Sequence, residues 1–204
     1  MKKTQAKPKQ EEFDDYDDED DNEVRDAAYY ENALVQTINE FSVFVASITR
    51  DLETQEKEYM DDLRKKGKKI PKAIWVDSTF KIDFVTKILL QYFGDQRDRL
   101  MKYYIIFLLK MKPWITARKE EFFLKANIFP GAPEADIKFF RDLWAIDGTM
   151  SDKEKATIWN FWDVQIEIVE DWQAVTGWKV NPNEKLNIPN IDYTGEAKRL
   201  GLEL

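Results

Sequence analysis

The chain has 204 residues, 43% hydrophobic and 14% aromatic, which is enough apolar side chain for one substantial core. It contains neither cysteine nor histidine, which excludes disulfides, Ser-His-Asp triads, Cys-His pairs and zinc sites with the usual ligands. The net charge of −8 is segregated, because residues 64–125 carry +10 between acidic flanks. Since no Gly-rich phosphate loop occurs either, we expect a non-enzyme without a cofactor or a small-molecule substrate.

The first 26 residues are rich in charge and poor in apolar side chains. Residues 1–10 are basic, and residues 11–26 hold eleven carboxylates with one arginine, Arg25. Such a run repels itself and has little apolar area to bury, so we expect residues 1–26 to be disordered. The basic start is followed by no apolar segment of a secretory signal, and no apolar run approaches the roughly 20 residues of a spanning helix. We therefore expect an intracellular protein without a membrane span.

Residues 27–72 are predicted to form a long helix with a basic end. Its apolar residues are spaced alternately four and three apart, and Tyr59 and Leu63 continue the pattern in phase. Such a narrow stripe, here called the seam, is typical of a coiled coil. The seam residues are Leu34, Ile38, Phe41, Val45, Ile48 and Leu52. The seam either packs on the rest of the chain or pairs with a protein partner or a second copy, and we take these six residues as candidate partner contacts.

Residues 73–180 are predicted to form a compact helical domain, so the fold class is all-α. The expected helices lie at about 77–94, 95–111, 114–125, 133–147 and 151–177. The tight joint at Gly94 and Asp95 predicts an antiparallel hairpin between the first two. A capping box of Ser151 and Glu154 should open the last helix, whose apolar residues cover roughly 220° of its circumference and predict a central position.

The segment 181–204 is predicted to be an extended C-terminal tail. It contains Asn181-Pro182-Asn183 and Ile188-Pro189-Asn190, which are typical of turns and loops. We expect this tail to pack loosely on the surface.

Carboxylates on the last helix are the only candidates for metal or acid–base chemistry. Asp163, Glu167 and Glu170 share one face and could hold Mg²⁺ through oxygen ligands. The same face lies opposite the apolar arc, so the favoured interpretation is an ordinary solvated face. Trp159 and Trp162 have helical spacing and are interpreted as core residues rather than a ligand site.

A cluster of cations follows the seam. It consists of Arg64, Lys65, Lys66, Lys68, Lys69 and Lys72. Three interpretations remain open: contact with phosphates of a polyanion, a solvated helix end, or pairing with the acidic residues 11–26. For the third, we expect the acidic run to lie close to the cluster on average, held by attraction that is screened beyond about 8 Å.

Aromatic-rich stretches between residues 80 and 178 form a distinctive pattern. They are Lys112-Pro113-Trp114-Ile115-Thr116-Ala117-Arg118-Lys119, Phe122-Phe123, Phe129-Pro130-Gly131-Ala132-Pro133-Glu134, Phe139-Phe140-Arg141-Asp142-Leu143-Trp144 and Lys155-Ala156-Thr157-Ile158-Trp159. With an acidic run ahead of a lysine-rich body, the pattern resembles small helical proteins of giant (nucleocytoplasmic large) DNA viruses. The resemblance implies a virus-encoded, non-catalytic helical protein carried in the virion, and it assigns no catalytic or binding residue.

The preferred hypothesis is a non-catalytic interaction or scaffold protein that binds a protein partner or a second copy through residues 34–63. The alternative is a nucleic-acid-associated protein that uses the basic region 64–125, where binding would fall steeply with salt. A hydrolase built on the carboxylates of the last helix is the third and least favoured hypothesis.

Overall fold

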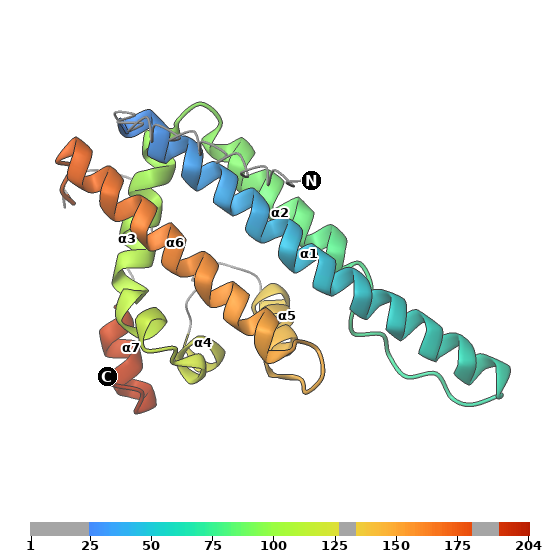
Figure 1. Cartoon of the computed structure of the whole chain (residues 1–204). Coiled ribbons are helices and arrows are strands. Elements are labelled where there is room, and N and C mark those ends of the chain that lie inside the picture. The colour runs from blue at the N-terminus through green and yellow to red at the C-terminus, as the bar shows by residue number, and fades with distance from the viewer. Residues whose placement is uncertain (1–24, 127–133, 181–191) are drawn as a thin grey trace, which may run out of the picture.

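The computed structural model describes residues 25–126, 134–180 and 192–204. Within these ranges the chain consists of helices joined by loops and contains no strand, which confirms the all-α prediction (Figure 1). The helices are α1 (Ala27–Lys65), α2 (Ser78–Phe93), α3 (Arg97–Thr116), α4 (Glu120–Lys125), α5 (Glu134–Ala145), α6 (Asp152–Thr176) and α7 (Tyr193–Leu200). The predicted disorder of residues 1–26 falls outside the described residues, except at Arg25 and Asp26.

Helix α1 is the longest element and runs along one side of the whole molecule (Figure 1). The Asp26 carboxylate caps its start by accepting a hydrogen bond from the Tyr29 amide at 2.9 Å. Its last turn carries Arg64 and Lys65, whose charges are favourable at the negative end of the helix dipole. With 39 residues, α1 is about 58 Å long at 1.5 Å per residue.

The seam of α1 is buried against other helices of the same chain. Leu34 and Ile38 belong to a core cluster that also contains residues of α2, α3 and α6. Val45, Ile48 and Leu52 belong to a second cluster with residues of α5 and α6, and Phe41 lies edge-on to Phe161 with ring centroids 5.5 Å apart. The seam therefore packs on the body. Five of these six side chains are buried within the chain, and Phe41 is partly buried.

Helix α2 packs antiparallel to α1 and not, as predicted, against α3 (Figure 1). The hydroxyl oxygens of Thr49 and Thr79 lie 3.2 Å apart where α2 begins. At its other end, Phe93 is buried in the cluster that contains Leu34 and Ile38. The tight joint at Gly94 directs α3 away across α6, so α2 and α3 touch only near the joint.

Helix α3 continues for one turn beyond the predicted stop at Pro113. Proline removes one backbone donor and crowds the carbonyl four residues earlier, which usually ends a helix. Here the turn is held by the buried side chains of Trp114 and Ile115. The Trp114 ring stacks on Phe122 with centroids 4.5 Å apart. The predicted helix at 114–125 is thus divided between the end of α3 and the short helix α4.

Helix α6 is central, as predicted, because it packs against α1 and against α3 (Figure 1). Its capping box is confirmed: the Ser151 hydroxyl accepts from the Glu154 amide at 3.3 Å, and the Glu154 carboxylate accepts from the Ser151 amide at 2.7 Å. Val169 and Trp172 are buried between the flanking helices.

The C-terminal segment differs from the predicted extended tail. Residues 181–191 lie outside the described residues, but the chain is helical from Tyr193 to Leu200. Asp192 caps α7 by accepting a hydrogen bond from the Gly195 amide at 2.9 Å. Tyr193 and Ala197 are buried in a cluster with residues of α3, α4 and α6. This segment is therefore part of the core.

Candidate functional site

The last turns of α1 and the loop that follows them form an arm. The arm is defined here as residues 53–77, and it extends past α5 and the start of α6 (Figure 1). Met60 and Leu63 are buried although they belong to none of the three core clusters of the body. The arm is therefore ordered by apolar contacts of its own and by the polar contacts described next.

The carboxylate of Glu56 holds the returning loop on α1. Its two oxygens accept hydrogen bonds from the backbone amides of Ile74 at 2.6 Å and Trp75 at 2.9 Å. Hydrogen bonds to an ionised carboxylate are among the stronger ones in proteins. The amide pair thus fixes the loop to a point about two and a half turns before the end of α1.

The carboxylate of Glu53 caps α2 from outside that helix. One oxygen accepts from the Ser78 hydroxyl at 2.9 Å and from the Thr79 amide at 2.7 Å. The N-cap residue Asp77 has a left-handed conformation (φ 60°) and its side chain makes no capping hydrogen bond. Glu53 therefore satisfies a free amide at the start of α2 and places a negative charge at the positive end of its dipole.

Trp75 connects the arm to the body. Its ring is 7% exposed and lies edge-on to Phe139 of α5, with centroids 6.0 Å apart. The side chains on either side of it, Ile74 and Val76, are exposed. Trp75 therefore points into the body, while the side chains before and after it face solvent.

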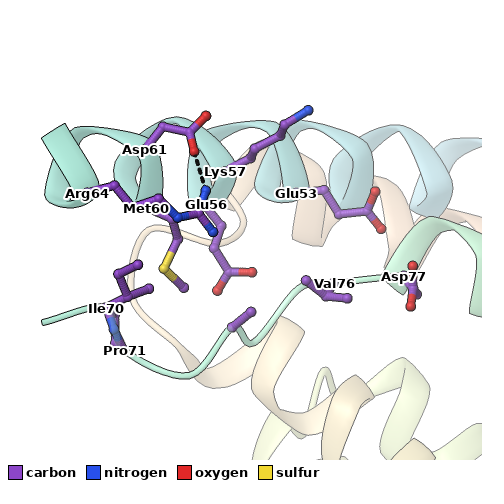
Figure 2. A pocket seen from close by; sticks show the side chains of 11 residues that line it. Glu53, Glu56, Lys57, Met60, Asp61, Arg64, Ile70, Pro71, Val76 and Asp77 are labelled. Carbon is purple, nitrogen blue, oxygen red and sulfur yellow. Dashed lines mark hydrogen bonds and ion pairs between the residues drawn. The ribbon is translucent and has the colours of Figure 1, made fainter.

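A pocket of about 500 Å³ lies between α1 and the loop (Figure 2). Figure 2 shows Glu53, Glu56 and Met60 pointing from α1 toward the loop. The apolar lining comes from Met60, Ile70, Pro71, Ala73 and Val76. Four carboxylates and two cations complete it: Glu53, Glu56, Asp61, Asp77, Lys57 and Arg64. The pocket is thus apolar on the loop side with an excess of negative charge.

Exposed apolar side chains are concentrated on the arm. They are Tyr59 (57% exposed), Ile70 (39%), Ile74 (53%) and Val76 (58%). The other exposed large apolar residues are spread over the rest of the described chain: Tyr29, Val43, Phe140, Ile146, Val164, Val175, Val180 and Leu204. Single exposed apolar residues are normal, whereas a concentration of them is characteristic of binding surfaces.

The six cations predicted to contact polyanions all lie exposed at the end of the arm, here called the tip (residues 64–72). Arg64 pairs with Asp61 and Lys66 pairs with Asp62, each at 2.6 Å. The other four have no carboxylate partner among the described residues: Lys65, Lys68, Lys69 and Lys72. Within the described residues, the tip therefore presents four ammonium groups without an ion-pair partner.

The remaining cations of the basic region 64–125 do not join the tip. They are distributed over α2, α3 and α4, and several form ion pairs: Lys102 with Asp98, Lys112 with Glu170, Arg118 with Asp163, and Lys125 with Glu121. The +10 of this region is consequently not one basic surface, and only the tip concentrates positive charge.

Two of the three candidate metal ligands on α6 form ion pairs with residues at or just after the end of α3, and the third, Glu167, is exposed. Asp163 accepts a bidentate pair of hydrogen bonds from the Arg118 guanidinium, and Glu170 pairs with Lys112 at 2.5 Å. This hydrogen bond to Asp163 raises the pKa of Arg118, whose guanidinium also lies 5.3 Å from the Trp159 ring centroid. No group of three acidic residues suited to a metal ion occurs in the described part of the chain.

Glu53 and Glu56 hold the loop of the arm in place, a role that the sequence did not reveal. Both contact backbone or side-chain groups between 18 and 26 positions later in the chain. Their spacing of three residues on α1, opposite a Pro-containing loop, is the only available signal, and it does not distinguish them from the other carboxylates of α1.

Comparison with known proteins finds no relative: no family model, no curated protein and no solved structure matches the chain. Within the ranges that the structure describes, no helix is both long and apolar enough to cross a membrane. The chemistry of the arm and its tip is therefore the basis for a functional conclusion.

Proposed function

We propose that the chain is a non-catalytic interaction protein that binds a protein partner through its arm. The observation that supports this is a set of four exposed apolar side chains on a part of the fold that projects from the body, two of which, Ile70 and Val76, also line the pocket. The body anchors the arm through Trp75, while Glu53 and Glu56 fix its loop. A rigid apolar surface is suited to binding because little conformational entropy is lost when a partner docks.

This proposal moves the binding surface from the seam to the arm. The seam side chains from Leu34 to Leu52 are used within the chain, whereas Tyr59 at the far end of the same stripe remains exposed. The sequence resemblance to small proteins of giant DNA viruses extends the proposal to a partner within a virion.

The test places a photoreactive amino acid at position 74, in cells that naturally make the protein. Val43 is the matched control, because it is also an exposed aliphatic residue, at 70% against 53% for Ile74. We expect Ile74 to yield one dominant cross-linked protein that is absent with Val43. Equal yields of the same products at both positions would contradict the proposal.

Nucleic-acid binding at the tip is the second candidate function. The four unpaired lysines of the tip favour it. Four phosphate contacts predict a slope of about −3.6 for the logarithm of the binding constant against the logarithm of salt concentration on duplex DNA. Replacing the four lysines by glutamine should abolish this binding, and a slope near zero for the unmodified protein would exclude it.

A further inference from the structure

The two strongest charge concentrations of the chain are attached to opposite ends of α1. Residues 11–26 carry eleven carboxylates and one arginine, and they lead directly into the first residue of α1. The tip carries six cations and no carboxylate at the other end. A helix of 39 residues, about 58 Å long, separates them.

The length of α1 prevents the acidic run from neutralising the tip of its own chain. The densest part of the run, residues 17–21, lies within nine residues of Asp26, so even a fully extended chain carries it at most about 32 Å from the helix start. Glu11 would reach the tip only if all the intervening residues were stretched taut. Attraction screened beyond about 8 Å cannot sustain such stretching, and pairing within one chain, as predicted from the sequence, is disfavoured.

The acidic run and the tip nevertheless match in chemistry. Phe13 and Tyr16 lie between the carboxylates of the run. The segment from Lys65 to Val76 carries four lysines that form no ion pair among the described residues, together with the exposed side chains of Ile70, Ile74 and Val76. The pocket itself is lined by more carboxylates than cations. The match therefore places an acidic ligand along the outer side of the loop and not inside the pocket.

We infer that residues 11–21 of one copy bind the tip of a second copy. This inference rests on the proposed function, because it names a second copy as one partner of the arm. Two chains with antiparallel α1 helices bring each acidic run beside the other chain's tip. The two contacts are then equivalent and close the assembly as a two-fold pair. Because the contacts are between exposed charges, the association is weak and sensitive to salt.

The test uses two full-length variants and sedimentation at low and high salt. The tip variant carries Lys→Glu at the four unpaired positions, Lys65, Lys68, Lys69 and Lys72. The tail variant carries Asp→Asn at Asp14, Asp15, Asp17 and Asp18. The unmodified protein should associate in 50 mM salt and bind itself at least about tenfold more weakly in 500 mM salt. Each variant alone should be monomeric, and an equimolar mixture should associate again, because the tip variant still has an acidic run and the tail variant still has a basic tip.

Two outcomes would overturn the inference. One is an unmodified protein that stays monomeric at high micromolar concentration in 50 mM salt, and the other is a tail variant that associates as strongly as the unmodified protein. If duplex DNA binds the tip in either case, the tip is a nucleic-acid contact and not a self-association site. If the inference fails, the cross-linking at position 74 still tests whether the arm binds a different protein, because a product that contains a second copy differs from one that contains another protein. Far-ultraviolet circular dichroism confirms that the four exposed substitutions leave the helices intact.

Discussion

Removing the carboxylate of Glu56 should release the arm while leaving its helix intact. In Glu56→Ala the amides of Ile74 and Trp75 lose both oxygens that they now contact. Ile74 is exposed, so its amide regains a partner from water, but the Trp75 amide is partly buried and is left less well satisfied. The perturbation therefore falls on the connection between the loop and the body.

The expected loss follows from these two environments. A hydrogen bond to a charged group contributes about 1.5–3 kcal/mol to stability. The amide of Ile74 keeps most of this contribution in the variant, because water replaces the carboxylate as its partner. Greater freedom of the released loop offsets part of the remainder. We expect Glu56→Ala to lower the free energy of unfolding by about 2 kcal/mol, equivalent to a fall of roughly 4–8 °C in Tm for a domain of this size. Glu56→Gln keeps one acceptor and should lose about half as much.

Urea unfolding and amide hydrogen exchange measure the effect. Glu58→Ala is the matched control, because Glu58 is an exposed carboxylate of the same helix and removing it should change stability by less than about 0.5 kcal/mol. In Glu56→Ala the amides of Ile74 and Trp75 should exchange faster than in the control. If the two variants are equally stable and both amides keep their protection, Glu56 does not hold the arm.

Three further perturbations probe the body. Ser151→Ala should destabilise α6 by about 1 kcal/mol because it removes the cap, whereas Ser47→Ala on the exposed face of α1 should not; thermal unfolding compares them. A double-mutant cycle on Arg118 and Asp163, whose side chains are 40% and 36% exposed, should give a coupling of about 0.2–1 kcal/mol, and Mg²⁺ should leave the stability of either variant unchanged. Burial, reinforced by a neighbouring tyrosine, raises the pKa of Tyr104 above 10. The folded state then keeps a proton that the unfolded chain loses, so stability falls as pH rises above 10, and Tyr104→Phe should make this fall shallower in urea titrations between pH 9 and 11.5.

The helices of the body were predictable because local patterns determine them. The alternating spacing from Leu34 to Leu52 identified the buried face of α1, and Ser151 with Glu154 marked the start of α6. The wide apolar arc of α6 correctly indicated contacts on two sides. In each case the signal lies within a few helical turns.

The pairing of helices was less predictable because distant residues decide it. A narrow apolar stripe does not reveal whether it meets its own chain or another, and here α2 and α6 cover it. The short joint at Gly94 suggested a hairpin, but α2 gains more by lying on α1, where Thr79 meets both Thr49 and Glu53. Pro113 was expected to end α3, yet packing of Trp114 on Phe122 extends the helix beyond it.

The candidate site was only half predictable from the sequence. The cations from Arg64 to Lys72 were identified as a cluster, and the structure exposes all of them at one place. The loop that holds them there depends on Glu53 and Glu56, which contact groups at least 18 positions away. The distance between the tip and the start of α1 likewise depends on α1 being unbroken over 39 residues.

Helix α7 was not predicted, because its two boundary residues are weak signals and two nearby Pro-Asn sequences indicated loops. Asp192 at the cap and Gly201 just after the end have the residue types expected at helix boundaries. The helix has eight residues, too few for a clear apolar period, so its stability comes from tertiary packing.

Replacing Tyr193 therefore distinguishes a docked α7 from the loosely packed tail that the sequence suggested. Tyr193 is 2% exposed and its ring lies 6.2 Å from that of Phe122, while the Trp114 indole donates to the Leu202 carbonyl at 3.2 Å. Truncating a buried aromatic ring costs about 3–5 kcal/mol. A terminal helix, however, can detach while the rest of the chain stays folded. The measured loss of stability therefore cannot exceed the free energy with which α7 docks on the body. We expect Tyr193→Ala to lower stability by at least about 2 kcal/mol and to expose the Leu202 amide to exchange, whereas Tyr193→Phe, which keeps the ring, should lose less than about 1 kcal/mol. A loss in Tyr193→Ala within about 0.5 kcal/mol of zero, the range of an ordinary surface substitution, would show that this segment does not contribute to the core.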